Sequence, residues 1–156
     1  MKIVIVGGVA GGATAAARIR RLDEKAEIVV FERSGYISYA NCGLPYYIGG
    51  TIEDEGDLTL QTPESFYKRF RVGMNVYHEV TAIHTEKKTI TVKNLKNGEV
   101  FEESYDKLIL SPGAKPVKPK FEGIDSDKIF TLRTVEDTLK IKKHIDENHP
   151  KSAVII

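Results

Sequence analysis

Two apolar runs near the N-terminus predict buried parallel strands at residues 2–6 and 27–31. Between them lie a glycine-rich turn at residues 7–12 and an alanine-rich stretch at residues 13–23, where apolar positions recur at helical spacing. Strand, turn, helix and strand within about 30 residues predict a βαβ unit. We expect the inner face of the helix to carry Gly12, Ala15 or Ala16, Ile19 and Leu22.

The middle of the chain predicts a second helix and several short strands. Thr62 and Pro63 are typical of an N-cap and a first helical position, and that helix should end near Phe70. Alternating apolar and polar residues predict strands at residues 75–83, 89–95 and 100–105, with a hairpin turn at Asn97 and Gly98. A short apolar run predicts another buried strand at residues 107–110.

The C-terminal third predicts a linker, a helix and the beginning of a strand. Residues 115–120 are rich in proline and lysine and cannot form a regular helix. Residues 134–147 predict a polar amphipathic helix, and residues 152–156 resemble the opening strand at residues 3–6. We therefore expect three parts: a nucleotide-binding part over residues 1–113, a linker and helix over 114–150, and the first strand of a further domain over 151–156.

Composition excludes several classes of protein. The 156 residues are 41% hydrophobic and 29% charged, which is ordinary for a folded soluble domain. A net charge of +1 gives no overall field for nucleic acid or a membrane surface. The first residues lack the pattern of a signal peptide, and no apolar run is long enough to span a bilayer. One cysteine, Cys42, cannot form an internal disulfide or a cysteine-based metal cluster, so we expect a cytoplasmic protein without a metal site.

The glycine turn indicates a dinucleotide. A Gly-x-Gly-x-x-Gly turn between strand and helix lets a pyrophosphate sit at the helix N-terminus; here Val9 replaces the second glycine. Glu32 ends the second strand about 20 residues later, where a carboxylate can accept from ribose hydroxyls. Alone, the glycine turn could equally be a simple strand-to-helix turn of an α/β protein, and the alternative for Glu32 is a solvated strand-end charge. Together with the βαβ unit, the turn and Glu32 favour dinucleotide binding.

Two basic clusters and the single thiol leave alternatives open. Thr14, Arg18 and Arg21 share one helical face, which is either solvated surface or a site for a second phosphate-bearing ligand. Lys68, Arg69 and Arg71 form the other cluster. Cys42 is either a small buried hydrophobe or a thiol near a helix N-terminus, which favours the thiolate. A working thiol without a partner cysteine must cycle through a mixed disulfide, a sulfenate or a persulfide.

Several segments resemble the FAD-dependent coenzyme A-disulfide reductases, a single-cysteine branch of the pyridine nucleotide-disulfide oxidoreductases. The pattern Ser-x-x-Asn-Cys-x-x-Pro-Tyr-Tyr at residues 38–47 is the most specific, and residues 7–24, 78–80, 104–114 and 131–133 also match. The resemblance implies an α/β, Rossmann-like FAD-binding domain of three layers, in which an antiparallel β-meander accompanies the parallel sheet and of which this chain is an incomplete part.

The resemblance also implies roles for individual residues. Cys42 would be the catalytic redox thiol. Residues expected to bind coenzyme A are Thr14, Arg18, Arg21, Ser38, Asn41, Arg69 and Arg71. Residues expected to hold FAD are Gly7, Val9, Ala10, Gly11, Gly12, Glu32, Arg33, Asn41, Cys42, Val80, Ser111, Pro112, Gly113 and Arg133. Phe70 stands where some relatives place a coenzyme A-binding lysine, for which Arg69 or Arg71 would substitute.

The implied chemistry is that of a cytoplasmic homodimeric flavoprotein in cell redox homeostasis. NAD(P)H would reduce FAD, which would reduce a mixed disulfide between Cys42 and coenzyme A. The nicotinamide site and part of the FAD site would lie outside this chain, so we expect the chain alone to hold FAD weakly and not to turn over. The alternatives are an NADH oxidase or peroxidase using a Cys42 sulfenate, and a non-catalytic nucleotide-binding module with a structural Cys42.

Overall fold

The computed structural model describes residues 1–155, which form two compact units. The first unit comprises Met1–Tyr39 and Thr59–Gly113. The second comprises Ala40–Leu58 and the chain from Ala114 onward. Among the described residues, no helix has the length and apolar character that crossing a membrane requires.

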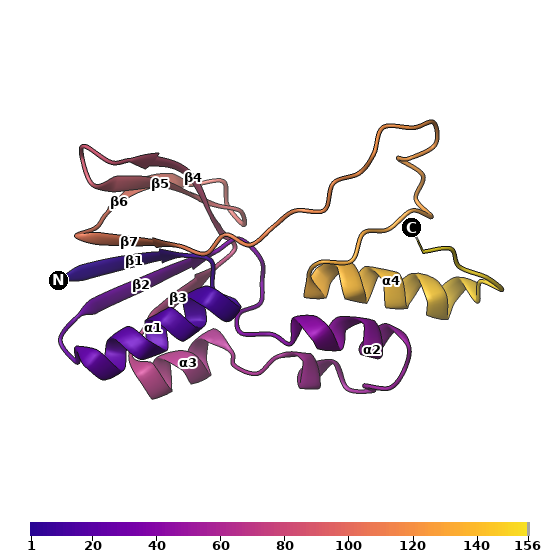
Figure 1. The fold of residues 1–156 in the computed structure, drawn as a ribbon, viewed down its shortest axis with the longest axis horizontal. Helices are drawn as coiled ribbons and strands as arrows, with labels where there is room; N and C mark the ends of the chain where they lie inside the picture. Colours follow the sequence, from indigo (N-terminus) through magenta and orange to yellow (C-terminus); the bar gives the residue numbers. More distant parts are fainter. Residues whose placement is uncertain (156) are drawn as a thin grey trace. The chain divides into compact units, whose positions relative to one another are not determined.

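The first unit has three layers (Figure 1). Its middle layer is a parallel sheet in the order β3-β2-β1-β7, made of Gly73–Val76, Glu27–Glu32, Lys2–Val6 and Lys107–Leu110. Two helices, α1 (Ala10–Leu22) and α3 (Pro63–Phe70), lie on one face. An antiparallel sheet covers the other face and consists of β4 (His78–His84), β5 (Thr89–Asn94) and β6 (Val100–Ser104). The Rossmann-like α/β fold with a β-meander is therefore confirmed.

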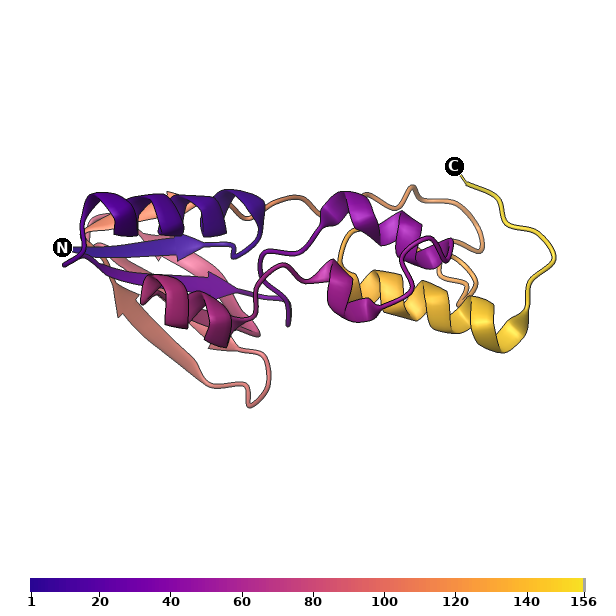
Figure 2. The same ribbon diagram turned by 90° about the horizontal axis from the view of Figure 1, so that it is seen from below.

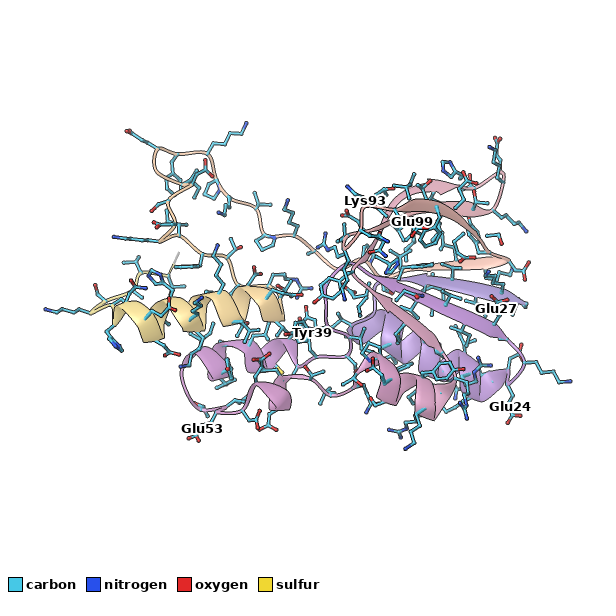
Figure 3. All side chains as sticks on the ribbon, turned by 180° about the vertical axis from the view of Figure 1, so that it is seen from behind. Glu24, Glu27, Tyr39, Glu53, Lys93 and Glu99 are labelled. Atoms are coloured by element: carbon cyan, nitrogen blue, oxygen red, sulfur yellow. The ribbon has the colours of Figure 1, made fainter. Side chains whose placement is uncertain are left out.

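Side-chain alternation along β1 explains why both faces are covered. Ile3 and Ile5 pack with the helices, whereas Val4 packs with Ile90 and Val92 of β5. Successive side chains of a strand point to opposite faces, so a wholly apolar run needs apolar partners on both sides. Figure 3 shows polar side chains outside this core: Glu27 at the start of β2, Lys93 on β5 and Glu99 before β6.

Helix α1 differs from the prediction in its start and in one core position. It begins at Ala10, three residues earlier than expected, and buries Gly12, Ala13, Ala16 and Ala17. Ile19 is partly buried, but Leu22 is 70% exposed, so its assignment to the inner face is wrong. At about 100° per residue, Leu22 lies about 150° from the middle of the buried face.

The predicted strand over residues 75–83 is wrong as one element. Tyr77, at φ +58°, breaks it into β3 and β4, which belong to different sheets. The helix predicted from Pro63 to Phe70 is confirmed as α3. Thr62 Oγ1 accepts from the Ser65 N–H at 3.2 Å and Ser65 Oγ accepts from the Thr62 N–H at 2.9 Å, which forms a capping box. The other predicted strands of this unit are confirmed within one residue at each end.

The second unit contains a 3₁₀ turn at Asn41–Gly43, helix α2 (Leu44–Ile48), a second 3₁₀ turn at Glu55–Leu58 and helix α4 (Val135–Asn148). Helices α2 and α4 lie side by side (Figure 2). Residues 115–120 have no regular structure, as predicted. The strand predicted for residues 152–156 is not formed over residues 152–155, where Val154 and Ile155 are 87% and 97% exposed and no neighbouring strand pairs with them. Residue 156 lies outside the described residues.

Candidate functional site

The N-terminus of α1 fits an anion. The Ala13 N–H donates to the Val9 carbonyl at 3.0 Å, so the N–H groups of Ala10, Gly11 and Gly12 precede the first hydrogen bond within the helix. No acidic residue lies in the first turn, and the Val9 side chain supplies no cap. This positive helix end therefore retains backbone donors for a pyrophosphate.

Close backbone contacts bring the two predicted cofactor turns together. A Cβ on Gly7, which has φ +95°, would lie 2.0 Å from the Ser111 carbonyl oxygen, and one on Gly11 would lie 3.2 Å from Ser111 Oγ. Ser111 is followed by the exposed Pro112 and Gly113. Val9 has φ −94°, outside the left-handed region that favours glycine, so this position of the turn does not require a positive φ. The turns at residues 7–12 and 111–113 thus form one surface of the first unit.

Glu32 is a buried carboxylate. It is 8% exposed; its Oε2 accepts from the Gly8 N–H and its Oε1 from the Ser34 N–H, each at 2.8 Å. The alternative of a solvated strand-end charge is therefore wrong. Each carboxylate oxygen can accept a second hydrogen bond, so Glu32 retains acceptor capacity for a ribose. The donors of the glycine turn and this carboxylate fit a dinucleotide such as FAD.

Two other predicted FAD residues have clear positions in the first unit. Arg33 follows Glu32 and is exposed. Val80 pairs with Val92 beside an irregularity in the β4–β5 ladder, and its side chain packs into the core between the two sheets.

The predicted coenzyme A residues of α1 share one exposed face. Thr14, Arg18 and Arg21 are all exposed, and at about 1.5 Å rise per residue they span about 10 Å of the helix. Ser38 belongs to the same unit, and its N–H donates to the Gly8 carbonyl at 3.0 Å, which ties residue 38 to the glycine turn.

Arg20, which sequence reasoning missed, connects the C-terminal ends of α1 and α3. Its Nε donates to the Phe70 carbonyl at 2.8 Å and its Nη2 to the Arg71 carbonyl at 3.0 Å. Its Nη1 donates to the carbonyls of Asp23 and Glu24 at 3.3 and 2.6 Å. The one signal in the sequence is an arginine in the last turn of a helix, where carbonyl groups lack helical partners.

The Arg20 contacts hold the second basic cluster near the end of α1. The guanidinium carbon of Arg69 lies 5.1 Å from the centroid of the Phe70 ring, and that of Arg71 lies 5.6 Å from the centroid of the Tyr67 ring. Phe70 itself packs against the core, and its ring centroid lies 4.7 Å from that of Phe66. Phe70 is thus a packing residue, and Lys68, Arg69 and Arg71 are exposed cations at this place.

Cys42 lies in the second unit and is an exposed, free thiol. It occupies the middle of the 3₁₀ turn Asn41–Gly43, directly before α2, so the helix predicted near Cys42 is present but begins at Leu44. The interpretation of Cys42 as a small buried hydrophobe is wrong, because the buried residues here are Gly43 and Leu44. Exposure leaves the sulfur open to a disulfide or peroxide in solution.

Arg133 contacts the residue next to Cys42. Its Nη1 donates to Asn41 Oδ1 at 3.0 Å, across 92 residues of sequence. The N–H groups of Arg133 and Thr134 both donate to Asp137 Oδ2 at 3.0 Å, and the bond from Thr134 belongs to the capping box of α4. Asn41, Cys42 and Arg133, three of the residues expected at the flavin, therefore belong to one unit. Within residues 1–155, no group of three or more His, Cys, Asp or Glu side chains could hold a metal ion.

Comparison with known proteins identifies the family. Residues 1–156 match the family model described as pyridine nucleotide-disulphide oxidoreductase. The chain belongs to this family. It is 51% identical over 155 residues to coenzyme A disulfide reductase of Staphylococcus aureus strain JH9, which covers 99% of this chain and 35% of the relative. The chain thus spans about a third of the length of the curated relatives it matches, and the resemblance seen in the sequence is confirmed.

Solved structures of this oxidoreductase family agree. A reduced Bacillus anthracis CoADR-RHD has a TM-score of 0.95 and 56% identity, over 96% of this chain and 27% of that one. An NAD-dependent persulfide reductase from A. fulgidus has a TM-score of 0.89 and 36% identity, over 95% of this chain and 28% of that one. A water-forming NADH oxidase from Lactobacillus brevis has a TM-score of 0.88 and 34% identity, over 94% of this chain and 32% of that one.

Proposed function

We propose that this chain is the N-terminal part of an FAD-dependent, NAD(P)H-using enzyme that reduces coenzyme A disulfide or a coenzyme A persulfide through Cys42. The observation that carries the proposal is an exposed single cysteine directly after Asn41, in a chain 51% identical to coenzyme A disulfide reductase over 99% of its length. We place the enzyme in the cytoplasm as a homodimer, with no nucleic acid or membrane partner.

The glycine turn and Glu32 support FAD as the cofactor. The backbone donors at the start of α1 would hold its pyrophosphate, the Glu32 carboxylate its adenosine ribose, and the backbone of Val80 its adenine. Arg33 and residues 111–113 would complete this part of the site. FAD, when bound, supplies two-electron transfer from a nicotinamide to a sulfur. We assign residues 1–113 to the FAD-binding domain, 114–150 to a linker and helix, and 151–156 to the beginning of the NAD(P)H-binding domain.

The thiol step follows from Cys42 itself. Its thiolate attacks one sulfur of coenzyme A disulfide, a mixed disulfide forms, and one coenzyme A thiolate leaves. The exchange itself consumes no external electrons; one two-electron reduction of the mixed disulfide, with NAD(P)H as the donor and FAD as the carrier, would release the other coenzyme A as thiolate and restore the Cys42 thiolate. The exposed guanidinium groups of Arg18 and Arg21, with Thr14, suit the phosphates of coenzyme A. Ser38 and Asn41 would lie beside the bound thiol, and Arg69 or Arg71 would replace the missing lysine.

A second candidate function is an NADH oxidase or peroxidase, in which Cys42 cycles through a sulfenate. The 34% identity and TM-score of 0.88 to a water-forming NADH oxidase support it. A non-catalytic nucleotide-binding module would leave the exposed thiol without a role.

Intact-mass spectrometry of the chain tests the proposal. The reduced protein is incubated with coenzyme A disulfide or with oxidised glutathione, beside the Cys42→Ser variant. We expect one coenzyme A adduct that dithiothreitol removes, formed faster than the glutathione adduct, and none in Cys42→Ser. Replacing Arg18 and Arg21 by glutamine should remove the preference for coenzyme A. Equal rates with both disulfides, together with ready gain of one oxygen from hydrogen peroxide, would favour the oxidase or peroxidase.

A chimera tests turnover. This chain would replace the matched 155 residues of the Staphylococcus aureus reductase, and release of free coenzyme A from its disulfide would be followed at saturating NADH and NADPH. We expect disulfide-dependent turnover in a chimera that binds flavin. A chimera that binds flavin and reduces oxygen, but not the disulfide, would contradict the proposal.

A further inference from the structure

The Arg133 guanidinium donates a hydrogen bond to the side-chain amide oxygen of Asn41, the residue directly before Cys42. The distance from Arg133 Nη1 to Asn41 Oδ1 is 3.0 Å, and both side chains are partly buried. A guanidinium only donates hydrogen bonds, whereas an asparagine side chain has one acceptor oxygen and one NH₂ group. The contact therefore determines which end of the Asn41 amide faces Arg133, and the NH₂ group lies at the other end.

Arg133 is itself held by the start of α4. Asp137 Oδ2 accepts from the N–H groups of Arg133 and Thr134, each at 3.0 Å, and the Asp137 N–H donates to Thr134 Oγ1 at 3.2 Å. Val135, the first residue of α4, is fully buried, which anchors this helix end further. Two fixed contacts thus connect the cap of α4 with the 3₁₀ turn that carries Cys42, all within the second unit.

We propose that Arg133 is a positioning residue, which holds the Asn41 amide so that its NH₂ group serves the sulfur chemistry at Cys42. An N–H donor beside a sulfur favours the thiolate over the thiol and stabilises a thiolate leaving group. This inference rests on the proposed function, in which Cys42 is the redox thiol. It gives Arg133 a role toward Asn41 in addition to the expected contact with FAD.

A double-mutant cycle on Cys42 reactivity tests the inference. The rate of Cys42 alkylation by iodoacetamide would be measured in this chain without added flavin, from about pH 6 to about pH 9, an interval that includes the ordinary cysteine pKa of about 8.5. The variants are Arg133→Gln, Asn41→Ala and the two together, with Lys143→Gln as the matched control. Lys143 is an exposed cation of the same helix α4, paired with Glu147 at 3.7 Å.

We expect Arg133→Gln and Asn41→Ala each to slow alkylation at neutral pH by about twofold to tenfold, the range of one hydrogen bond. The pH of half-maximal rate should move upward, and the double variant should be no slower than the slower single variant. Lys143→Gln should leave the rate unchanged. Arg133→Lys should restore part of the rate, because lysine keeps a donor but loses the planar fork.

Three results would overturn the inference: an unchanged rate in Arg133→Gln, an unchanged rate in Asn41→Ala, or effects that multiply in the double variant. Far-UV circular dichroism shows whether α4 is retained, and Asn41→Ala tests the same contact should Arg133→Gln unfold it. Failure here is separable from failure of the proposed function. If Cys42 exchanges with coenzyme A disulfide at a rate that does not depend on Arg133, only this inference is overturned. If Arg133 and Asn41 affect alkylation as one unit but Cys42 does not exchange with coenzyme A disulfide, only the proposed substrate is overturned.

Discussion

Gly12 has no room for a side chain, because a Cβ there would lie 1.7 Å from the Gly7 carbonyl oxygen. We predict that Gly12→Ala lowers the free energy of unfolding by about 1–3 kcal/mol, since backbone must move to admit the methyl group. Urea denaturation measures this. Gly73→Ala is the matched control, because its Cβ would meet nothing within 4 Å, and its effect should stay within about 0.5 kcal/mol. Equal effects of the two variants would contradict the steric explanation.

The Glu32 carboxylate accepts hydrogen bonds from the N–H groups of Gly8 and Ser34, and in our proposal it also holds the ribose of FAD. Glu32→Gln keeps one acceptor oxygen but exchanges the other for an NH₂ group facing a backbone N–H. We predict a loss of about 1–3 kcal/mol in the free energy of unfolding, the cost of a buried donor without an acceptor. Glu27→Gln is the control, because Glu27 is exposed and pairs with Lys2 at 3.2 Å. An unchanged urea midpoint in Glu32→Gln would restore the view of Glu32 as a solvated charge.

At the scale of elements, α1 and α3 are joined by one side chain. Arg20 donates to carbonyls at the ends of both helices, whereas Arg18, two residues earlier, is exposed. We predict that Arg20→Lys lowers the free energy of unfolding by about 1–3 kcal/mol, because one ammonium cannot reproduce a fork of donors. Arg18→Lys should have no measurable effect on urea unfolding. A larger loss of unfolding free energy in Arg18→Lys than in Arg20→Lys would contradict the role of Arg20 in joining the two helices.

The stability of the fold should depend on pH through Glu64, in the first turn of α3. Hydrogen bonds from its own backbone N–H and from the Thr62 side chain hold the pKa of Glu64 below its usual value of 4.5. The ionised carboxylate therefore stabilises the fold fully above that value, and the contribution is lost as pH falls through the folded-state pKa. We expect the difference in unfolding free energy between the native chain and Glu64→Gln to be constant near neutral pH and to shrink below pH 4.5. A difference that persists unchanged to about pH 3, well below the usual glutamate pKa, would contradict this.

At the scale of the whole molecule, we propose that the chain supplies only part of the FAD site. It spans 35% of the Staphylococcus aureus reductase, and the family resemblance implies that later segments close around the flavin. We therefore predict that FAD is lost from the 156-residue chain on gel filtration, as read from the ratio of flavin to protein absorbance. Flavin retained at one per chain would show that residues 1–156 hold it without further segments.

The local elements could be predicted from the sequence because their signals act within a few residues. The apolar run of β1, the cap at Thr62 and the turn at Gly98 each depend on neighbours in the chain. The glycine turn, Glu32 and the Asn41-Cys42 pair were also recognisable as candidate site residues. Residue types and spacing favoured a dinucleotide but left Cys42 open between a small buried side chain and a working thiol. The family resemblance added the redox role of Cys42 and coenzyme A as its substrate.

Tertiary structure decided what depends on residues far apart in sequence. It divided the predicted strand at Tyr77 between two sheets, because β3 pairs with β2 and β4 with β5. It buried the Glu32 carboxylate between two backbone donors and exposed Leu22. It also brought Arg133 to Asn41 across 92 residues. Periodicity and capping specify the elements, but a contact between distant side chains arises only when the packed backbone places them within reach.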